Sequence, residues 1–181
     1  MILEKKMIFG DPYKFAIQLD FVDDWVSRWG ETMKNEGVFH YIIGGYIQPT
    51  ELMNQSVTIL SAINSLKVKQ SNINRISTEN LYDQVSKDAF QILESILSKI
   101  LNGDETDEEY EIYISTHLNI EENMFGDQNN WIISNDQNEK IIFRNYKNEL
   151  YEIILDKGYC SEVIDNVLVW ARNYFTEECW I

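Results

Sequence analysis

The sequence predicts an α+β fold: an antiparallel sheet of about six to eight strands, with a long central helix and a C-terminal helix packed on it. Two observations lead to this class. Short segments of alternating apolar and polar residues are separated by turn residues, as in antiparallel strands. Two longer segments, 79–101 and 161–175, repeat their apolar residues at helical spacing. Strands and helices therefore come in separate runs, which favours α+β over alternating βαβ units.

The first strand is expected at residues 15–21, where apolar side chains occupy every second position. Residues 10–12 before it, Gly-Asp-Pro, have the composition of a turn. Residues 38–47 predict a hairpin, because the adjacent Gly44 and Gly45 can adopt the positive φ angles of a tight turn. Further strands, the second and third of them joined as a hairpin, are expected at residues 110–118, 131–134, 140–144 and 150–155.

Residues 56–68 fit two patterns. Val57, Ile59 and Ser61 alternate as in a strand, whereas Ile59, Ala62, Ile63 and Leu66 would share one face of a helix. We favour a strand, because the intervening serines and asparagines are weak helix formers. Residues 70–75 are polar and are expected to form a loop.

The main helix is expected at residues 79–101. Thr78 is placed to cap its start, and Asn102 and Gly103 are placed to end it. Residues 104–109 would then form an acidic loop. The apolar stripe of the expected helix consists of Leu81, Val85, Ala89, Ile92, Leu93, Ile96, Ile100 and Leu101.

The length of 181 residues suits a single domain spanning residues 1–181. The formal net charge of −15 argues against binding to nucleic acid, whose phosphates would be repelled. The same charge would speed the capture of a basic protein, although an acidic surface can also serve solubility alone.

Several features point to a cytoplasmic protein. No segment approaches the ~20 apolar residues of a membrane helix, so no membrane contact is expected. The apolar residues near the start are interrupted at once by Gly10 and lack the pattern of a signal peptide. Cys160 and Cys179 are far apart in the chain and fit free thiols in a reducing compartment.

The chain offers no candidate catalytic residue, metal ligand or cofactor site. His40 lies in the expected hairpin and His117 near the end of an expected strand, and neither belongs to a zinc-binding pattern. Neighbouring carboxylates would point to opposite faces of a strand, so they do not form a catalytic dyad. We therefore expect a protein that is not an enzyme.

The N-terminal third contains an ordered series of short motifs. Phe-Gly-Asp-Pro at residues 9–12 is followed by Phe-Ala-Ile at 15–17, by acidic residues before Trp25, and by Gly37, Phe39 and Tyr41 leading to Gly45 and Pro49. In order and spacing, this series resembles the start of the bacterial immunity protein 42 family.

The resemblance implies a function and a partner. Proteins of this family are thought to protect a cell from a polymorphic toxin, so the implied partner is a cognate toxin domain, bound tightly and stoichiometrically in the cytoplasm. A basic nuclease would suit the acidic surface, because opposite charges accelerate association. The toxin's activity and the oligomeric state are left open.

Acidic segments are the candidate partner-binding residues. Carboxylates steer a basic partner, and an aromatic side chain among them can anchor it. The alternative is a solvated acidic surface with no partner. The candidates are Asp23, Asp24, Asp104, Glu105, Asp107, Glu108, Glu109, Glu177, Glu178 and Trp180.

Two other functions remain open. A small-molecule or peptide-binding α+β module would need a deep apolar pocket with converging polar groups. A hydrolase would need a cleft that holds a carboxylate or histidine with a perturbed pKa. The binding module could use a sheet face lined by Tyr41, Tyr46, Tyr110 and Tyr113.

Overall fold

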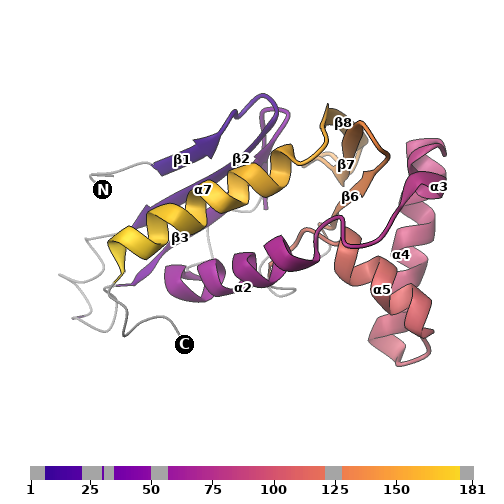
Figure 1. Cartoon of the computed structure of the whole chain (residues 1–181), viewed down its shortest axis with the longest axis horizontal. Helices are drawn as coiled ribbons and strands as arrows, with labels where there is room; N and C mark the ends of the chain where they lie inside the picture. The colour runs from indigo at the N-terminus through magenta and orange to yellow at the C-terminus, as the bar shows by residue number, and fades with distance from the viewer. Residues whose placement is uncertain (1–6, 22–29, 31–34, 50–56, 121–127, 176–181) are drawn as a thin grey trace.

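The computed structural model describes residues 7–21, 30, 35–49, 57–120 and 128–175. Its architecture is α+β, which confirms the predicted class. The eight described strands form two antiparallel sheets rather than one, and the five described helices pack around them (Figure 1).

The first sheet has the strand order β1-β2-β3-β4, with β5 paired to the start of β3. The predicted hairpin is confirmed, since Gly44 and Gly45 have φ angles of 58° and 85° and connect the paired residues Ile43 and Tyr46. The strands are β1 (Met7–Gly10), β2 (Phe15–Phe21), β3 (Glu36–Ile43), β4 (Tyr46–Gln48) and β5 (Val57–Thr58).

The predicted turn between β1 and β2 is also present, and Gly10 is essential to it. Gly10 has a φ of 93°, and a Cβ atom there would lie 2.5 Å from the carbonyl oxygen of Phe15. Asp11 Oδ1 accepts a hydrogen bond of 2.9 Å from the backbone N–H of Tyr13, which stabilises the turn.

Two helices, α2 (Ile59–Asn72) and α7 (Tyr159–Tyr174), cover one face of the first sheet (Figure 1). Their apolar side chains meet alternate residues of β2 and β3 in the large core. Aromatic and branched aliphatic side chains dominate this core, which accounts for much of the buried apolar area. Its fully buried members include Phe15, Ile17, Leu19, Phe39, Tyr41, Ile59, Ile63, Leu66, Ile164 and Val167.

The second sheet consists of β6 (Asn130–Ser134), β7 (Asn138–Arg144) and β8 (Leu150–Asp156). One face, including Ile132 and Phe143, belongs to the large core. The other face contributes Trp131, Ile133 and Ile142 to a small core that also contains Ala89, Phe90 and Leu93. Because both faces are covered, β6 is buried at every position and its sequence does not alternate.

Three helices form what we call the helical lobe: α3 (Glu79–Tyr82), α4 (Ser86–Asn102) and α5 (Asp107–Thr116). The lobe lies at one end of the molecule, against the face of the second sheet that points away from α2 and α7 (Figure 1). As predicted, α4 ends at Gly103, which has a φ of 72°.

The single helix expected at residues 79–101 is divided in two. The chain leaves helical geometry after Tyr82 and resumes at Ser86. Thr78 does not cap a helix with its side chain; its Oγ1 accepts a hydrogen bond of 2.7 Å from the backbone N–H of Ser134. Val85, assigned to the buried stripe, is 71% exposed at the break.

The strand favoured for residues 56–68 is wrong beyond Thr58. Residues 59–72 form α2, and the side chains buried along it are Ile59, Ala62, Ile63 and Leu66. These residues are spaced as one helical face, and burying that stripe outweighs the weak helix propensity of the intervening serines and asparagines. The loop expected at 70–75 therefore begins only after Asn72.

The strand expected at residues 110–118 is also wrong, because residues 107–116 form α5. Its apolar side chains do not share one helical face, and α5 contacts three elements, α4, α2 and β6. That arrangement hides the helical period and leaves an apparent alternation of Tyr110, Ile112 and Ile114.

Candidate functional site

The structure brings five of the candidate partner-binding residues together, where the chain leaves α4 and enters α5. Residues 104–106 form a short loop, as expected, but residues 107–109 belong to the first helical turn of α5. The five are Asp104, Glu105, Asp107, Glu108 and Glu109, whereas Asp23, Asp24, Glu177, Glu178 and Trp180 lie outside the described residues.

A capping box begins α5. Thr106 Oγ1 accepts a hydrogen bond of 3.2 Å from the N–H of Glu109, and Glu109 Oε2 accepts one of 3.0 Å from the N–H of Thr106. Lys99, in the last turn of α4, forms an ion pair with Glu109 Oε1. The hydrogen bond from Lys99, with that from the Thr106 backbone, lowers the pKa of Glu109. Glu109 therefore holds α5 against α4.

Three of the other four carboxylates at this end are exposed to solvent. Asp104, Asp107 and Glu108 are exposed, and Glu105 is half-buried. Asp107 and Glu108 occupy the first turn of α5, where the helix dipole favours negative charge. These side chains are available to a partner, whereas Glu109 is occupied within the fold.

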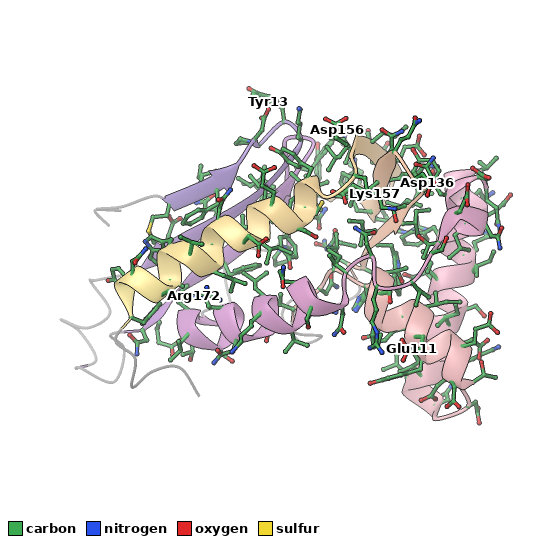
Figure 2. The ribbon with its side chains drawn as sticks, in the orientation of Figure 1. Tyr13, Glu111, Asp136, Asp156, Lys157 and Arg172 are labelled. Carbon is green, nitrogen blue, oxygen red and sulfur yellow. The ribbon has the colours of Figure 1, made fainter. Side chains whose placement is uncertain are left out.

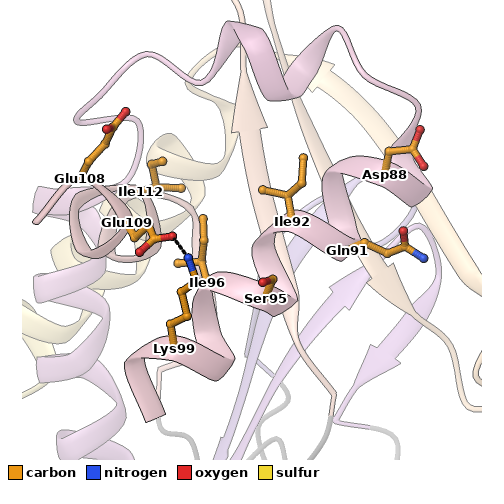
Figure 3. Close-up of a pocket in the computed structure, with 9 residues that line it drawn as sticks. All are labelled: Asp88, Gln91, Ile92, Ser95, Ile96, Lys99, Glu108, Glu109 and Ile112. Atoms are coloured by element: carbon orange, nitrogen blue, oxygen red, sulfur yellow. Dashed lines mark hydrogen bonds and ion pairs between the residues drawn. The ribbon is translucent and has the colours of Figure 1, made fainter. Parts of the chain in front are cut away.

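An open groove of about 700 Å³ runs between α4 and α5 (Figure 3). The helical spacing of its α4 residues places them on one face of that helix. Glu108, Glu109 and Ile112 line it from α5, and the Lys99–Glu109 pair joins the two helices at one end. The α4–α5 groove is lined from α4 by Asp88, Gln91, Ile92, Ser95, Ile96 and Lys99.

Sequence reasoning missed this groove. Ile92 was assigned to the buried stripe of a helix, yet its side chain is 39% exposed at the groove. The sequence contained one sign of the groove. The apolar stripe on α4 includes the adjacent residues Ile92 and Leu93, so it is wider than one helical face. The capping box could also be predicted from the sequence, because Glu109 follows Thr106 by three residues.

A partly buried polar network connects the helical lobe to the second sheet. Glu94 Oε1, on α4, accepts hydrogen bonds of 2.8 Å from Trp131 Nε1 and 3.0 Å from Asn129 Nδ2. Asn129 Oδ1 lies 3.3 Å from His117 Nε2. The His117 ring packs on Trp131, with 4.7 Å between ring centroids. The network fixes where α4 sits on the sheet.

Both histidines are buried. Burial, with the nearby Lys69 ammonium, lowers the pKa of His117 to about 3, despite the opposing hydrogen bond to Asn129. Burial also lowers the pKa of His40, although Asp20 opposes the shift. A neutral His117 fits its role as a packed ring beside Trp131.

The buried carboxylate of Glu139, on β7, caps the start of α7. Its oxygens accept hydrogen bonds of 3.0 Å from the N–H of Gly158 and 2.6 Å from the N–H of Cys160. The N-cap residue of α7, Gly158, has a φ of 89° and no side chain, so the unpaired N–H groups at this end are bound by Glu139 from β7. Burial and Glu139 raise the pKa of the Cys160 thiol. The contacts of Glu139 are those of a structural cap, not of a hydrolase site.

A second exposed acidic region lies where the β6–β7 turn meets the end of β8. Figure 2 shows Asp136, Asp156 and Lys157 grouped there, while Glu111 projects from α5 elsewhere. Pairing of Asn138 with Asp156 explains the grouping. Lys157 places a positive charge among the carboxylates, so this tip is less uniformly acidic than the start of α5.

The four tyrosines expected to line one sheet face do not come together. Tyr41 is fully buried in the large core, where its hydroxyl donates a hydrogen bond of 2.8 Å to the carbonyl of Leu118. Tyr46 lies on β4. Tyr110 and Tyr113 lie on α5, in the helical lobe. This arrangement removes the binding surface proposed for a small-molecule module.

Among the described residues, no group of three or more histidine, cysteine, aspartate or glutamate side chains could hold a metal ion. None of the described helices is both long and apolar enough to cross a membrane.

The family model described as Immunity protein 42 matches residues 7–170. The chain belongs to the immunity protein 42 family. The match extends well beyond the N-terminal third whose motifs suggested it. It includes the helical lobe and both sheets.

One solved structure shares the fold of this immunity protein 42 family member. It is the crystal structure of CdiI from Burkholderia dolosa AUO158, with a TM-score of 0.65 and 19% sequence identity. The alignment covers 91% of this chain and 99% of that one, so the two share nearly their whole architecture. A search of curated proteins found no match.

Proposed function

We propose that this protein is an immunity protein that neutralises a cognate bacterial toxin by tight, stoichiometric binding in the cytoplasm. The family match over residues 7–170 is the observation that carries the proposal. The fold shared with a CdiI protein supports it.

The charge distribution supports a binding mechanism. A formal net charge of −15 creates an attractive field for a basic partner and accelerates encounter. The exposed carboxylates Asp104, Asp107 and Glu108 concentrate that field at the start of α5. A basic toxin domain, such as a nuclease, is the partner that this surface would capture fastest.

The buried titratable groups support a role without catalysis. Glu139 caps α7, and His117 packs in a network with Asn129 and Trp131. Both have contacts that explain their burial, and neither lines the α4–α5 groove. Inhibition by occupying a surface of the toxin needs only a stable fold and a complementary face.

Co-expression tests the proposal. The probe is the C-terminal domain encoded by the gene directly upstream, produced in a bacterial host with and without this protein. Growth arrest by that domain should disappear when the protein is present, and a 1:1 complex should be recovered. Continued arrest, with both proteins folded and soluble, would contradict the proposal.

A further inference from the structure

We propose that the α4–α5 groove is the toxin-binding site and that it receives an amphipathic basic helix of the toxin. This inference rests on the proposed function and specifies the surface and the chemistry of the partner. It commits to one occupant among the many that an exposed groove could in principle hold.

The apolar floor of the groove is a first reason. Ile92 and Ile96 of α4 and Ile112 of α5 line it, while Leu93 on the same helix is buried in the small core. α5 has 10 residues and α4 has 17, so the shorter helix leaves part of this α4 face uncovered. The 39% exposure of Ile92 marks the uncovered part. An apolar side chain from a partner would bury it.

The geometry favours a helix as the occupant. Both walls are α-helices, whose backbone groups are already paired within each helix, so the groove offers no strand edge. An extended peptide would leave its own N–H and C=O groups unpaired, whereas a helix satisfies them internally. The stretch from Asp88 to Lys99 is about 16 Å long at 1.5 Å per residue, which matches about three turns of a docked helix.

The charges on the rim set the sign of the partner. Asp88 stands on the α4 side and Glu108 on the α5 side, and both are exposed. The single lysine among the lining residues, Lys99, is paired with Glu109. Lysine or arginine residues flanking the apolar stripe of the docked helix would meet both rims. A second copy of this chain, with a formal net charge of −15, would be repelled.

A bulky side chain in the groove provides a direct test. Ser95 is exposed and lines the groove, so Ser95→Trp would fill it without entering the small core. Ser98 is exposed on the same helix outside the groove and provides the matched control, Ser98→Trp. Binding is measured by calorimetry with the purified C-terminal domain encoded directly upstream. Ser95→Trp should weaken the Kd at least 10-fold and abolish growth rescue, and Ser98→Trp should leave both unchanged.

Two further pairs of variants separate apolar contact from charge. Ile92→Asp should weaken the Kd at least 10-fold, whereas Leu101→Asp, at a residue 64% exposed outside the groove, should not. Glu108→Arg should slow association more than Asp165→Arg, an equal charge change on the exposed face of α7. Equal slowing by both would mean that only the overall field matters.

Hydrogen exchange on the complex identifies the occupant. Protection should appear in residues 88–99 of this protein and in one segment of the toxin that carries basic residues around a helical apolar stripe. Tight binding by Ser95→Trp and Ile92→Asp, with protection elsewhere, would overturn the groove proposal and leave the proposed function intact. Failure of the wild-type protein to bind or rescue would instead remove the proposed function, and this inference with it.

Discussion

The large core and the helical lobe differ in how they are built. The large core is filled by apolar side chains such as Phe15, Ile17 and Phe39, all fully buried between the first sheet, α2 and α7. The helical lobe meets the second sheet through the small apolar core and a polar network around Glu94, and it keeps an open groove. The contrast separates a scaffold with a packed apolar core from the surface that we propose binds the toxin.

The large core should tolerate truncation least. Phe39 packs edge-on against Tyr41, with 5.1 Å between ring centroids, and is fully buried. Phe39→Ala should lower the free energy of unfolding by about 3–5 kcal/mol, through lost burial and a cavity. Urea unfolding followed by circular dichroism measures it. Ile92→Ala at the groove is the comparison, and a similar loss there would break the distinction between scaffold and surface.

Removing the Glu139 cap of α7 should destabilise the protein nearly as much. Glu139→Gln would replace the carboxylate that now accepts hydrogen bonds from the N–H groups of Gly158 and Cys160 with an uncharged amide. Hydrogen bonds to charged groups contribute about 1.5–3 kcal/mol each, so we expect a loss of about 2–3 kcal/mol in urea unfolding. Asp165→Asn, on the exposed face of the same helix beyond its first turn, is the control and should change stability by less than about 0.5 kcal/mol.

The polar network should make stability depend on pH. The pKa of His117 is about 3 in the folded protein, against an ordinary value of 6.5, so the unfolded chain binds more protons between these values. Stability should therefore fall as pH drops below 6.5, with a slope of at most about 1.4 kcal/mol per pH unit from this residue. His40, whose pKa is also lowered, adds in the same direction.

His117→Phe isolates the contribution of His117, because a phenyl ring can keep the packing on Trp131 but cannot take up a proton. Unfolding midpoints at pH 7.5 and 5.5 should differ less for the variant than for the wild type. An identical pH dependence would mean that the buried imidazole is not the titrating group.

The capping box of α5 should give the smallest effect. Thr106→Ala removes the acceptor for the N–H of Glu109 and should lower the free energy of unfolding by about 1 kcal/mol. Thr106→Ser keeps the hydroxyl and should recover most of it, as thermal unfolding can show. A cost near that of Phe39→Ala would place the start of α5 in the scaffold rather than at the surface.

The elements that the sequence predicted well are those whose pattern has one cause. The Gly44–Gly45 hairpin depends on two adjacent positive φ angles, and β2 depends on alternate apolar side chains that enter the large core. For α2 the two patterns competed, and the buried spacing of Ile59, Ile63 and Leu66 outweighed weak helix propensity. For α5, which contacts α4, α2 and β6, the apolar side chains do not share one face, so the sequence lacks the period that would have revealed a helix.

The candidate site was predictable in part. The acidic start of α5 was visible as a cluster of carboxylates, and the spacing of Thr106 and Glu109 indicated a capping box. The ion pair of Glu109 with Lys99 could be found only from the fold. The groove depends on how two helices of unequal length pack, which no local pattern contains. Glu94 precedes its hydrogen-bond partners Asn129 and Trp131 by 35 and 37 positions in the chain. This network could therefore not be predicted without the fold.

Titration of the toxin's own activity tests the central claim most directly. The purified C-terminal domain from the upstream gene is assayed with increasing amounts of this protein, at concentrations far above the expected Kd. If the protein acts by binding alone, toxin activity should fall linearly and reach zero at one equivalent. Full activity at several equivalents, or complete inactivation by a small fraction of one equivalent, would contradict inhibition by stoichiometric binding.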